Sequence, residues 1–206
     1  MSSVDGQDRQ LLYSANSIRS PAPAFNSRWV TFMAADNGNW DIYIIDTSTS
    51  AVRRLTTHEA NDGLPVWSPD GRKLAFVSNR SGTPQIHVQD LVSGREERLT
   101  FEGRYNTTPS WSPQGDRIAY SSAEDGGFNI YVIDLGTRKR LQLTRNTGNN
   151  ESPSWSPDGS LVVFSSNREG PYRIYVMTGY GTDQRRLLTL PGEQTNPKWS
   201  PSAAVS

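Results

Sequence analysis

The chain has 206 residues, of which 34% are hydrophobic, with 21 basic and 21 acidic side chains and no cysteine. This balance of charge gives no field that would attract nucleic acid or an anionic membrane, so neither is expected as a partner. Disulfides and thiolate metal sites are excluded, and no apolar stretch reaches the length of a membrane span.

A short motif recurs along the chain at a constant interval. Residues 67–71 read Trp-Ser-Pro-Asp-Gly, residues 155–159 repeat it, residues 111–115 carry glutamine for aspartate, and residues 199–201 keep its first three letters. The tryptophans at 67, 111, 155 and 199 are 44 residues apart. A constant period of this length predicts a stack or ring of similar supersecondary units.

This phase delimits the units in chain order. Residues 9–13 lie four periods before the Arg-Leu-Leu-Thr segment at 186–189, so residues 1–20 are predicted to hold the outer strand of an incomplete unit. Residues 197–206 are predicted to supply a trailing inner strand. The four whole units are predicted at 21–64, 65–108, 109–152 and 153–196, all within one domain.

Each unit is predicted to contain four short antiparallel strands separated by turns. The first carries the tryptophan, the second is apolar on both faces as at 74–77, the third reads Ile-Tyr-Val-Ile at 130–133, and the fourth is more polar. A strand that is apolar on both faces belongs to a sheet packed between two others. The sequence therefore predicts an all-β fold of four-stranded antiparallel sheets.

The two edge strands of each sheet differ in chemistry. Pro65, Pro109, Pro153 and Pro197 fall in the first strand, where proline cannot donate to a ladder, so this strand is expected at the inner edge, facing a channel. The polar fourth strand is expected at the outer edge, exposed to water. These features predict the blades of a β-propeller. A solenoid fits less well, because its units usually add one or two strands to a shared sheet.

The repeated motifs resemble those of one known family. Pro-x-Trp-Ser-Pro-Asp-Gly, Leu-Ala-Phe-Val-Ser-Asn-Arg at 74–80, Ile-Tyr-Val-x-Asp at 130–134 and Arg-x-Leu-Thr at 186–189 resemble the WD-repeat-like blades of TolB-type propellers over nearly the whole chain. The resemblance implies a non-enzymatic binding module of the periplasm whose partner is an envelope lipoprotein. Similar blades occur in prolyl-oligopeptidase-type peptidases, tricorn-like proteases and oligogalacturonate lyases.

The number of units departs from that family, whose propellers have six blades after a separate α/β domain. Four whole units with additional terminal strands suggest a fragment, an engineered truncation or an unusually small relative. The terminal strands would leave exposed edges, so pairing with another copy, and hence a homo-oligomer, is expected.

One mouth of the channel is predicted to bind the partner. The connections from each outer strand to the next inner strand converge there, and loops in such places commonly carry binding. The predicted partner-binding residues are Asn61, Asp62, Arg104, Tyr105, Asn106, Asn149, Asn150, Glu193 and Gln194. The alternative is that these residues cap turns. Arg80 and Arg168 border the same mouth, either to meet a partner's carboxylates or as solvated turn residues.

Other conspicuous residues have structural explanations. The Ser-Pro-Asp-Gly segment is expected to form a turn, and Trp155 to be buried between blades. His87 shares the phase of three tyrosines and is expected to pack within a strand. His58, in a polar loop, is the one histidine suited to a metal or ligand site.

No known catalytic motif supports an enzyme. The sequence lacks a Gly-x-Ser-x-Gly elbow, a His-Glu-x-x-His helix and a phosphate-binding glycine loop. The leading hypothesis is a protein-binding scaffold without catalytic residues, cofactor or metal. Two alternatives stay open: the propeller portion of a hydrolase or an oligogalacturonate-lyase-like enzyme, and an engineered propeller fragment without activity.

Overall fold

The computed structural model describes residues 13–15, 17–24, 28–35, 38–124, 126–145 and 148–200. These residues form four antiparallel sheets of four strands each and contain no helix. The strands are β1 (Ile18–Pro23), β2 (Trp29–Ala34), β3 (Asp41–Asp46), β4 (Val52–Arg54), β5 (Asp62–Trp67), β6 (Lys73–Ser78), β7 (Gln85–Asp90), β8 (Glu96–Arg98), β9 (Tyr105–Trp111), β10 (Arg117–Ala123), β11 (Phe128–Asp134), β12 (Arg140–Gln142), β13 (Asn150–Trp155), β14 (Leu161–Ser166), β15 (Arg173–Thr178) and β16 (Arg185–Arg186).

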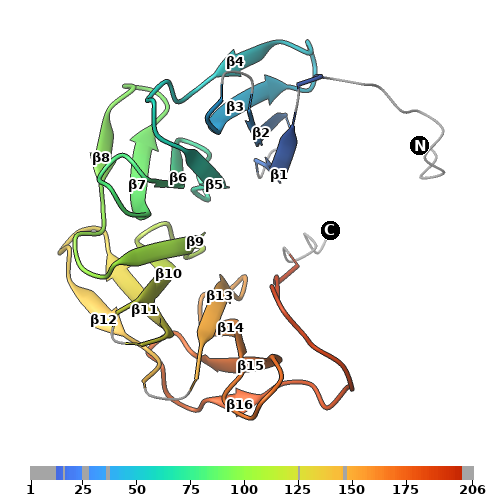
Figure 1. The fold of residues 1–206 in the computed structure, drawn as a ribbon, viewed down its shortest axis with the longest axis vertical. Coiled ribbons are helices and arrows are strands. Elements are labelled where there is room, and N and C mark those ends of the chain that lie inside the picture. The colour runs from blue at the N-terminus through green and yellow to red at the C-terminus, as the bar shows by residue number, and fades with distance from the viewer. Residues whose placement is uncertain are drawn as a thin grey trace.

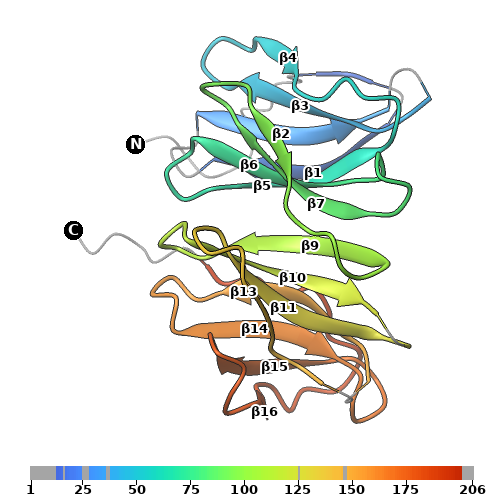
Figure 2. The same cartoon turned by 90° about the vertical axis from the view of Figure 1, so that its left-hand side faces the viewer.

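Each sheet is a meander in which consecutive strands pair, from β1–β4 (blade 1) through β5–β8 (blade 2) and β9–β12 (blade 3) to β13–β16 (blade 4). The first strand of each blade lies at the centre and the fourth at the rim (Figure 1). The sheets pack face to face around the centre (Figure 2). The predicted all-β fold of propeller blades is confirmed.

Large apolar side chains fill the spaces between blades. Trp155, 5% exposed, packs in one cluster with Ile130, Val132 and Leu143 of blade 3 and with Val162 of its own blade. Burying a side chain of this size stabilises the fold by about 1.5–3 kcal/mol. The tryptophan of the motif thus joins blades, as predicted.

The Ser-Pro-Asp-Gly segments are turns, again as predicted. Ser68 Oγ donates to Asp70 Oδ1 at 2.6 Å, and the amide of Arg72 donates to the same oxygen at 3.0 Å. Gly71 ends the turn with φ +68°, a conformation that favours glycine. These turns lie at the end of the channel that we call the turn end, defined by residues 68–72, 112–116 and 156–160.

Each inner strand contains a β-bulge just before its proline, where the register with the second strand shifts. The residue before the proline has a positive φ although it is not glycine, which is an uncommon and strained conformation. These residues are 44 positions apart: Ser20, Leu64, Thr108, Ser152 and Asn196, with φ of 50°, 50°, 49°, 57° and 52°. The strain is therefore a repeated feature of the inner strands.

The predicted terminal segments are only partly described. Residues 9–12 lie outside the described residues, and the ring of Tyr13 lies 5.2 Å from that of Phe32 in blade 1. Residues 201–206 also lie outside them, and residues 197–200 form no strand. Trp199 nevertheless packs on Val163 and Ile174 and covers a face of blade 4.

The predicted bounds of the units differ slightly from those of the sheets. The inner strand of blade 2 begins at Asp62, three residues before the predicted boundary at Pro65. Pro65 lies inside the strand, at the bulge where the register shifts between Gly63 and Val66. The motif therefore gave the 44-residue period, but it did not indicate the residue at which the strand begins.

Candidate functional site

Two kinds of loop meet at the end of the channel opposite the turn end. In an antiparallel meander, the hairpin between the second and third strands lies at the same end as the connection to the next blade. The amide of Asn79 donates to the carbonyl of Asn61 at 3.1 Å, and the amide of Asp62 donates to the carbonyl of Trp40 at 2.8 Å. We call this end the mouth, and it comprises residues 38–40, 55–64, 79–84, 99–107, 124, 126–128, 143–145, 148–151, 167–172 and 187–196.

Three of the nine predicted partner-binding residues are buried beneath the mouth. Asp62, Asn106 and Asn150 have no exposed surface. Asn106 Nδ2 donates to Gln85 Oε1 at 2.8 Å, and Asn150 Nδ2 donates to Asn129 Oδ1 at 3.3 Å. These bonds tie the inner strands of blades 3 and 4 to the third strand of the preceding blade. Binding of a partner at these three positions stays a prediction. Their buried side chains hold the loops of the mouth in place and do not form part of its exposed surface.

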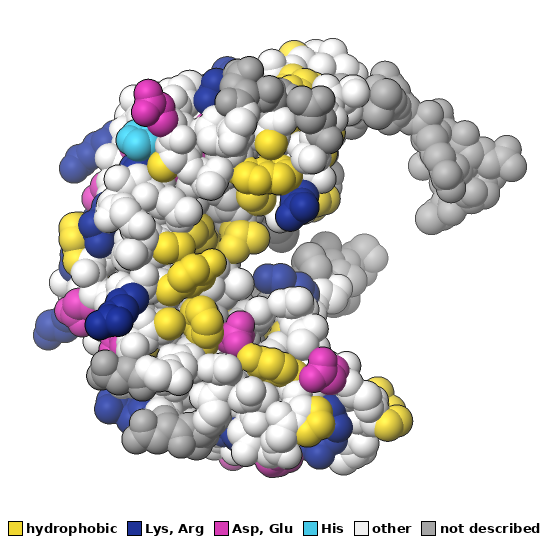
Figure 3. All heavy atoms as spheres, viewed as in Figure 1, with side chains coloured by type: hydrophobic (Ala, Val, Ile, Leu, Met, Phe, Trp, Pro, Cys, Tyr) yellow, Lys and Arg dark blue, Asp and Glu magenta, His cyan; other side chains and the backbone are white. Residues whose placement is uncertain are grey.

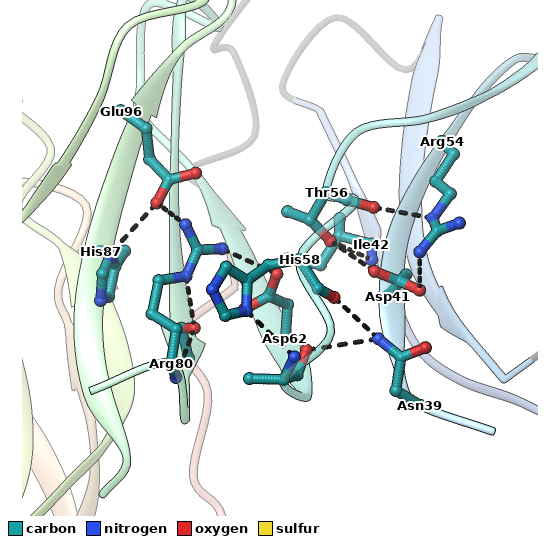
Figure 4. Close-up of polar contacts among 12 residues, drawn as sticks. Asn39, Asp41, Ile42, Arg54, Thr56, His58, Asp62, Arg80, His87 and Glu96 are labelled. Carbon is teal, nitrogen blue, oxygen red and sulfur yellow. Dashed lines mark hydrogen bonds and ion pairs between the residues drawn. The ribbon is translucent and has the colours of Figure 1, made fainter. Parts of the chain in front are cut away.

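Arg80 is also committed to internal contacts. Its Nη2 donates to Asp62 Oδ2 at 2.8 Å, its Nε donates to Ser78 Oγ at 2.8 Å, and its other terminal nitrogen contacts Glu96 (Figure 4). Burial favours the protonated form of Glu96, but hydrogen bonds from His87 and Arg80 lower its pKa. Arg80 therefore neutralises two carboxylates of its own blade.

The same arrangement recurs in blade 4 and is reversed in blade 3. Arg168 donates to Asn150 Oδ1 at 2.8 Å, as Arg80 does to Asp62. In blade 3 the hairpin carries Glu124 instead, and the arginine comes from the outer strand, where Arg140 contacts Glu124 and stacks on Tyr131 at 3.7 Å. Blades 2, 3 and 4 thus each keep an arginine at this place, although it comes from the hairpin in blades 2 and 4 and from the outer strand in blade 3.

Two carboxylates face one another between blades 1 and 2, where later blades have amides. Asp41 and Asp62 occupy the positions held by Gln85 and Asn106 one blade further on. Burial raises the pKa of Asp41, and the charge of Asp62 raises it further, while Arg54, at 2.6 Å, opposes the shift (Figure 4). Among the described residues, Asp62 Oδ1 has no hydrogen-bond partner. Burial beside a second carboxylate therefore favours protonation of Asp41 at this junction.

The remaining amides of the predicted set cap strand ends. Asn61 Oδ1 accepts from the amide of Trp40 at 2.9 Å, and Asn149 Oδ1 accepts from that of Phe128 at 2.9 Å. Gln194 Oε1 accepts from a β15 amide at 3.3 Å. The turn-capping alternative therefore describes part of what these side chains do.

Four of the predicted residues are exposed to solvent: Asn61, Arg104, Tyr105 and Glu193. Tyr105 is 45% exposed, and its ring meets that of Phe128 edge to face, with centroids 5.7 Å apart. No ion pair joins Arg104 or Glu193 to another described residue. These side chains are accessible to a partner.

A set of apolar residues at the start of each third strand was missed in the sequence. The set has one member per blade at the 44-residue spacing: Trp40, Pro84, Phe128 and Tyr172. The Tyr172 hydroxyl donates to Glu151, and burial together with this bond raises its pKa to about 12. Extending the phase of the motif to Trp40 would have revealed the set.

A cavity of about 390 Å³ opens at the mouth where blades 1, 2 and 3 meet. Its apolar wall includes Met33, Trp40, Leu64, Pro84 and Tyr105, and two asparagine side chains lie at its edge. Figure 3 looks onto the mouth and shows hydrophobic side chains gathered beside the channel over these blades. We call this the mouth cavity.

Neither histidine lines the mouth cavity, and the two have separate surroundings. His87 is 4% exposed and its ring lies 5.7 Å from that of Phe76, so it packs within its strand, as predicted. His58 Nδ1 accepts from the amide of Ala60 at 3.0 Å. Among the described residues, no three His, Cys, Asp or Glu side chains are grouped so as to hold a metal ion. In the same part of the chain, no helix has the length and apolar character needed to cross a bilayer.

Radial four-stranded blades around a channel define this protein as a β-propeller. The family model "TolB beta propeller domain" matches residues 1–203. The chain therefore belongs to the TolB β-propeller family.

Three relatives show how far the likeness extends. The Tol-Pal system protein TolB of Francisella tularensis is 26% identical over 77 residues, which are 36% of this chain and 18% of that protein. The crystal structure of TolB from Acinetobacter baumannii has a TM-score of 0.77 at 30% identity, covering 88% of this chain and 46% of that one. A putative TolB from Agrobacterium tumefaciens has a TM-score of 0.81 at 23% identity, covering 94% and 70%. The chain thus spans less than half of the Acinetobacter protein.

Enzymes share the same architecture. Peptidases and an oligogalacturonate lyase superpose on the chain with TM-scores of 0.64 to 0.70 at 14 to 19% identity. Identity at this level shows the fold alone.

Proposed function

We propose that this chain is a non-enzymatic propeller that binds a protein partner with its mouth. The observation that carries the proposal is the mouth cavity, which lies beside exposed Tyr105 and Arg104 on loops held by buried hydrogen bonds. Concave, largely apolar surfaces with a few polar groups are the usual sites of recognition. Membership of the TolB family supports a protein partner, an envelope lipoprotein by resemblance, and a periplasmic location.

Site-specific photo-crosslinking tests this proposal. A benzophenone amino acid is placed at Asn61, Arg104 or Glu193, and at Arg72 on the turn end as a control, and the protein is expressed in its native host. We expect protein adducts from the mouth positions and not from Arg72, with the partner identified by mass spectrometry.

Two results would contradict the proposal. Equal adducts from both ends would show that the mouth is not selective. An activity on a peptide or oligogalacturonate substrate that is lost on mutation of mouth residues would favour the enzyme alternative.

As a separate part of this proposal, we predict that the protein forms a homo-oligomer. Pairing between copies through the edges of the incomplete terminal blade would give a mass above that of the 22.9 kDa chain in light scattering at high concentration. A mass of one chain at every concentration would contradict it.

A further inference from the structure

The repeats allow the requirements of the fold to be separated from those of a ligand. A residue that the blade needs should recur at 44-residue intervals, as the motif tryptophans do. In the wall of the mouth cavity, Trp40 and Pro84 belong to the set that recurs in every blade, but Met33 and Leu64 do not recur as apolar residues around the ring. Met33 is followed around the ring by Val77, Ser121 and Ser165, and Leu64 by Thr108, Ser152 and Asn196. At these two positions the apolar side chains are therefore confined to the blades that line the cavity, while the fold stays the same.

Leu64 is the least expected residue of this wall. It is 36% exposed and has φ +50°, so neither burial nor backbone conformation favours leucine there. Its counterparts Ser152 and Asn196 adopt the same conformation with polar side chains. Since the fold accepts polar residues at this position, leucine points to a ligand that buries it.

The polar groups around the cavity restrict the chemistry of that ligand. The side chains of Asn61 and Asn79 at its edge can pair with the N–H and C=O groups of an extended peptide. The guanidinium of Arg19 lies 5.0 Å from the ring of Trp40, and none of the described carboxylates forms an ion pair with it. Asp62, the acidic residue in the lining, is buried and already bound to Arg80. Among the described residues, the charge at this edge that has no ion-pair partner is thus positive.

We propose that the mouth cavity binds an extended segment of the protein partner, with one aliphatic or aromatic side chain inserted among Met33, Trp40 and Leu64. An adjacent carboxylate of that segment pairs with Arg19. This inference rests on the proposed function and names the kind of partner segment that the mouth recognises.

Capped peptides provide the first test. The probe is Ac-Ser-Gly-Asp-Phe-Gly-Ser-NH2, titrated into isotope-labelled full chain, and the readout is the indole N–H signal of Trp40, assigned with Trp40→Phe. We expect a saturable shift at millimolar concentration, about tenfold weaker binding when phenylalanine is replaced by alanine, and weaker binding when aspartate is replaced by asparagine or lysine. No shift, or equal affinity for the phenylalanine and alanine peptides, would overturn the proposal.

Variants copied from the other blades provide the second test. Leu64→Ser and Met33→Ser, which install residues found in later blades, should each weaken binding several-fold without changing the melting temperature appreciably. Thr108→Ser, at the equivalent position of the next blade, is the control and should bind as the wild type does. Arg19→Gln should abolish the preference for the aspartate peptide, whereas Arg53→Gln on the rim should not.

The outcomes distinguish this proposal from the proposed function. If crosslinking at the mouth persists at wild-type yield in Leu64→Ser and Met33→Ser, the mouth binds a partner but the cavity does not, and this inference fails alone. If trigalacturonate, rather than the peptide, shifts the Trp40 signal, the cavity binds an acidic glycan and the peptide assignment is wrong. If neither ligand binds and no crosslink forms at the mouth, both proposals fail.

Discussion

The two ends of the channel are built from the same strands but differ in how they vary. At the turn end, blades 2, 3 and 4 each repeat a serine, a proline and a turn in which the serine hydroxyl donates to an aspartate. At the mouth the buried hydrogen bonds recur, yet the exposed residues change from blade to blade. This contrast indicates that the residues of the turn end serve folding. The exposed residues of the mouth, which differ among blades, are free to recognise a partner.

Trp155→Ala should have the largest effect and should act on stability alone. Removing the indole leaves a cavity between blades 3 and 4, so we expect a loss of about 3–5 kcal/mol in the free energy of unfolding. Chemical denaturation measures this, and the probe peptide should bind unchanged at low temperature. A loss of peptide binding by folded protein would break the proposed separation between the two ends.

Arg80→Ala should have the next largest effect because it leaves Asp62 buried without its cation beside Asp41. Breaking such a buried pair is expected to cost about 3 kcal/mol. Arg104→Ala, whose side chain is exposed at the same mouth, is the matched control and should change stability by less than about 0.5 kcal/mol. If the two substitutions changed stability equally, the exposure of an arginine at the mouth would not distinguish residues that stabilise the fold from residues that are free to bind a partner.

Asp41→Asn should change the pH dependence of stability. The pKa of Asp41 is raised in the folded protein, so the folded state binds this proton more tightly than the unfolded chain. The resulting stability is fully present below the unfolded pKa of about 3.9 and is lost as pH rises through the folded pKa.

Asparagine cannot lose that proton, so the variant should gain stability relative to the wild type as pH is raised from about 4 to about 8. Melting curves across this range measure the gain. The reciprocal change Asn129→Asp, at the equivalent position of blade 3, should introduce a loss of stability at high pH. Parallel curves for all three proteins would contradict the assignment of this junction as the protonation-sensitive one.

Asp158→Asn at the turn end should have the smallest effect. Its effect on the pH dependence of stability should be opposite to that of Asp41→Asn, because the pKa of Asp158 is lowered and that of Asp41 is raised. Hydrogen bonds from Ser156 and Ser160 lower the pKa of Asp158 to about 2, so its contribution is present above the unfolded pKa and is lost as pH falls toward about 2. The variant should therefore lose less stability on acidification than the wild type. Gln114→Asp, in the equivalent turn of blade 3, should gain the acid dependence that Asp158→Asn loses.

The fold could be predicted from the sequence because a 44-residue phase fixes which residues are equivalent. Proline in the first strand and apolar runs in the second were enough to order the strands from channel to rim. The phase also identified Asp62, Asn106 and Asn150 as equivalent positions, but it placed them in the connecting loops, whereas they lie in inner strands.

What the phase could not give was the direction of each side chain. An asparagine at the start of a strand can face solvent or the preceding blade, and here it faces Gln85 or Asn129, which lie at the start of third strands and had not been singled out. The mouth cavity was missed for a related reason, since Met33, Leu64 and Tyr105 come from three blades and share no motif.

The bulge before each inner proline also bears on aggregation. Innermost strands leave one edge of their backbone unpaired toward the channel, and such an edge can template the addition of foreign strands. A kink at Leu64, Thr108 or Ser152, followed by a residue with no N–H, leaves only a few consecutive residues that another strand could join. The strained backbone thus shortens the unpaired edge that a foreign strand could extend at the centre of the molecule.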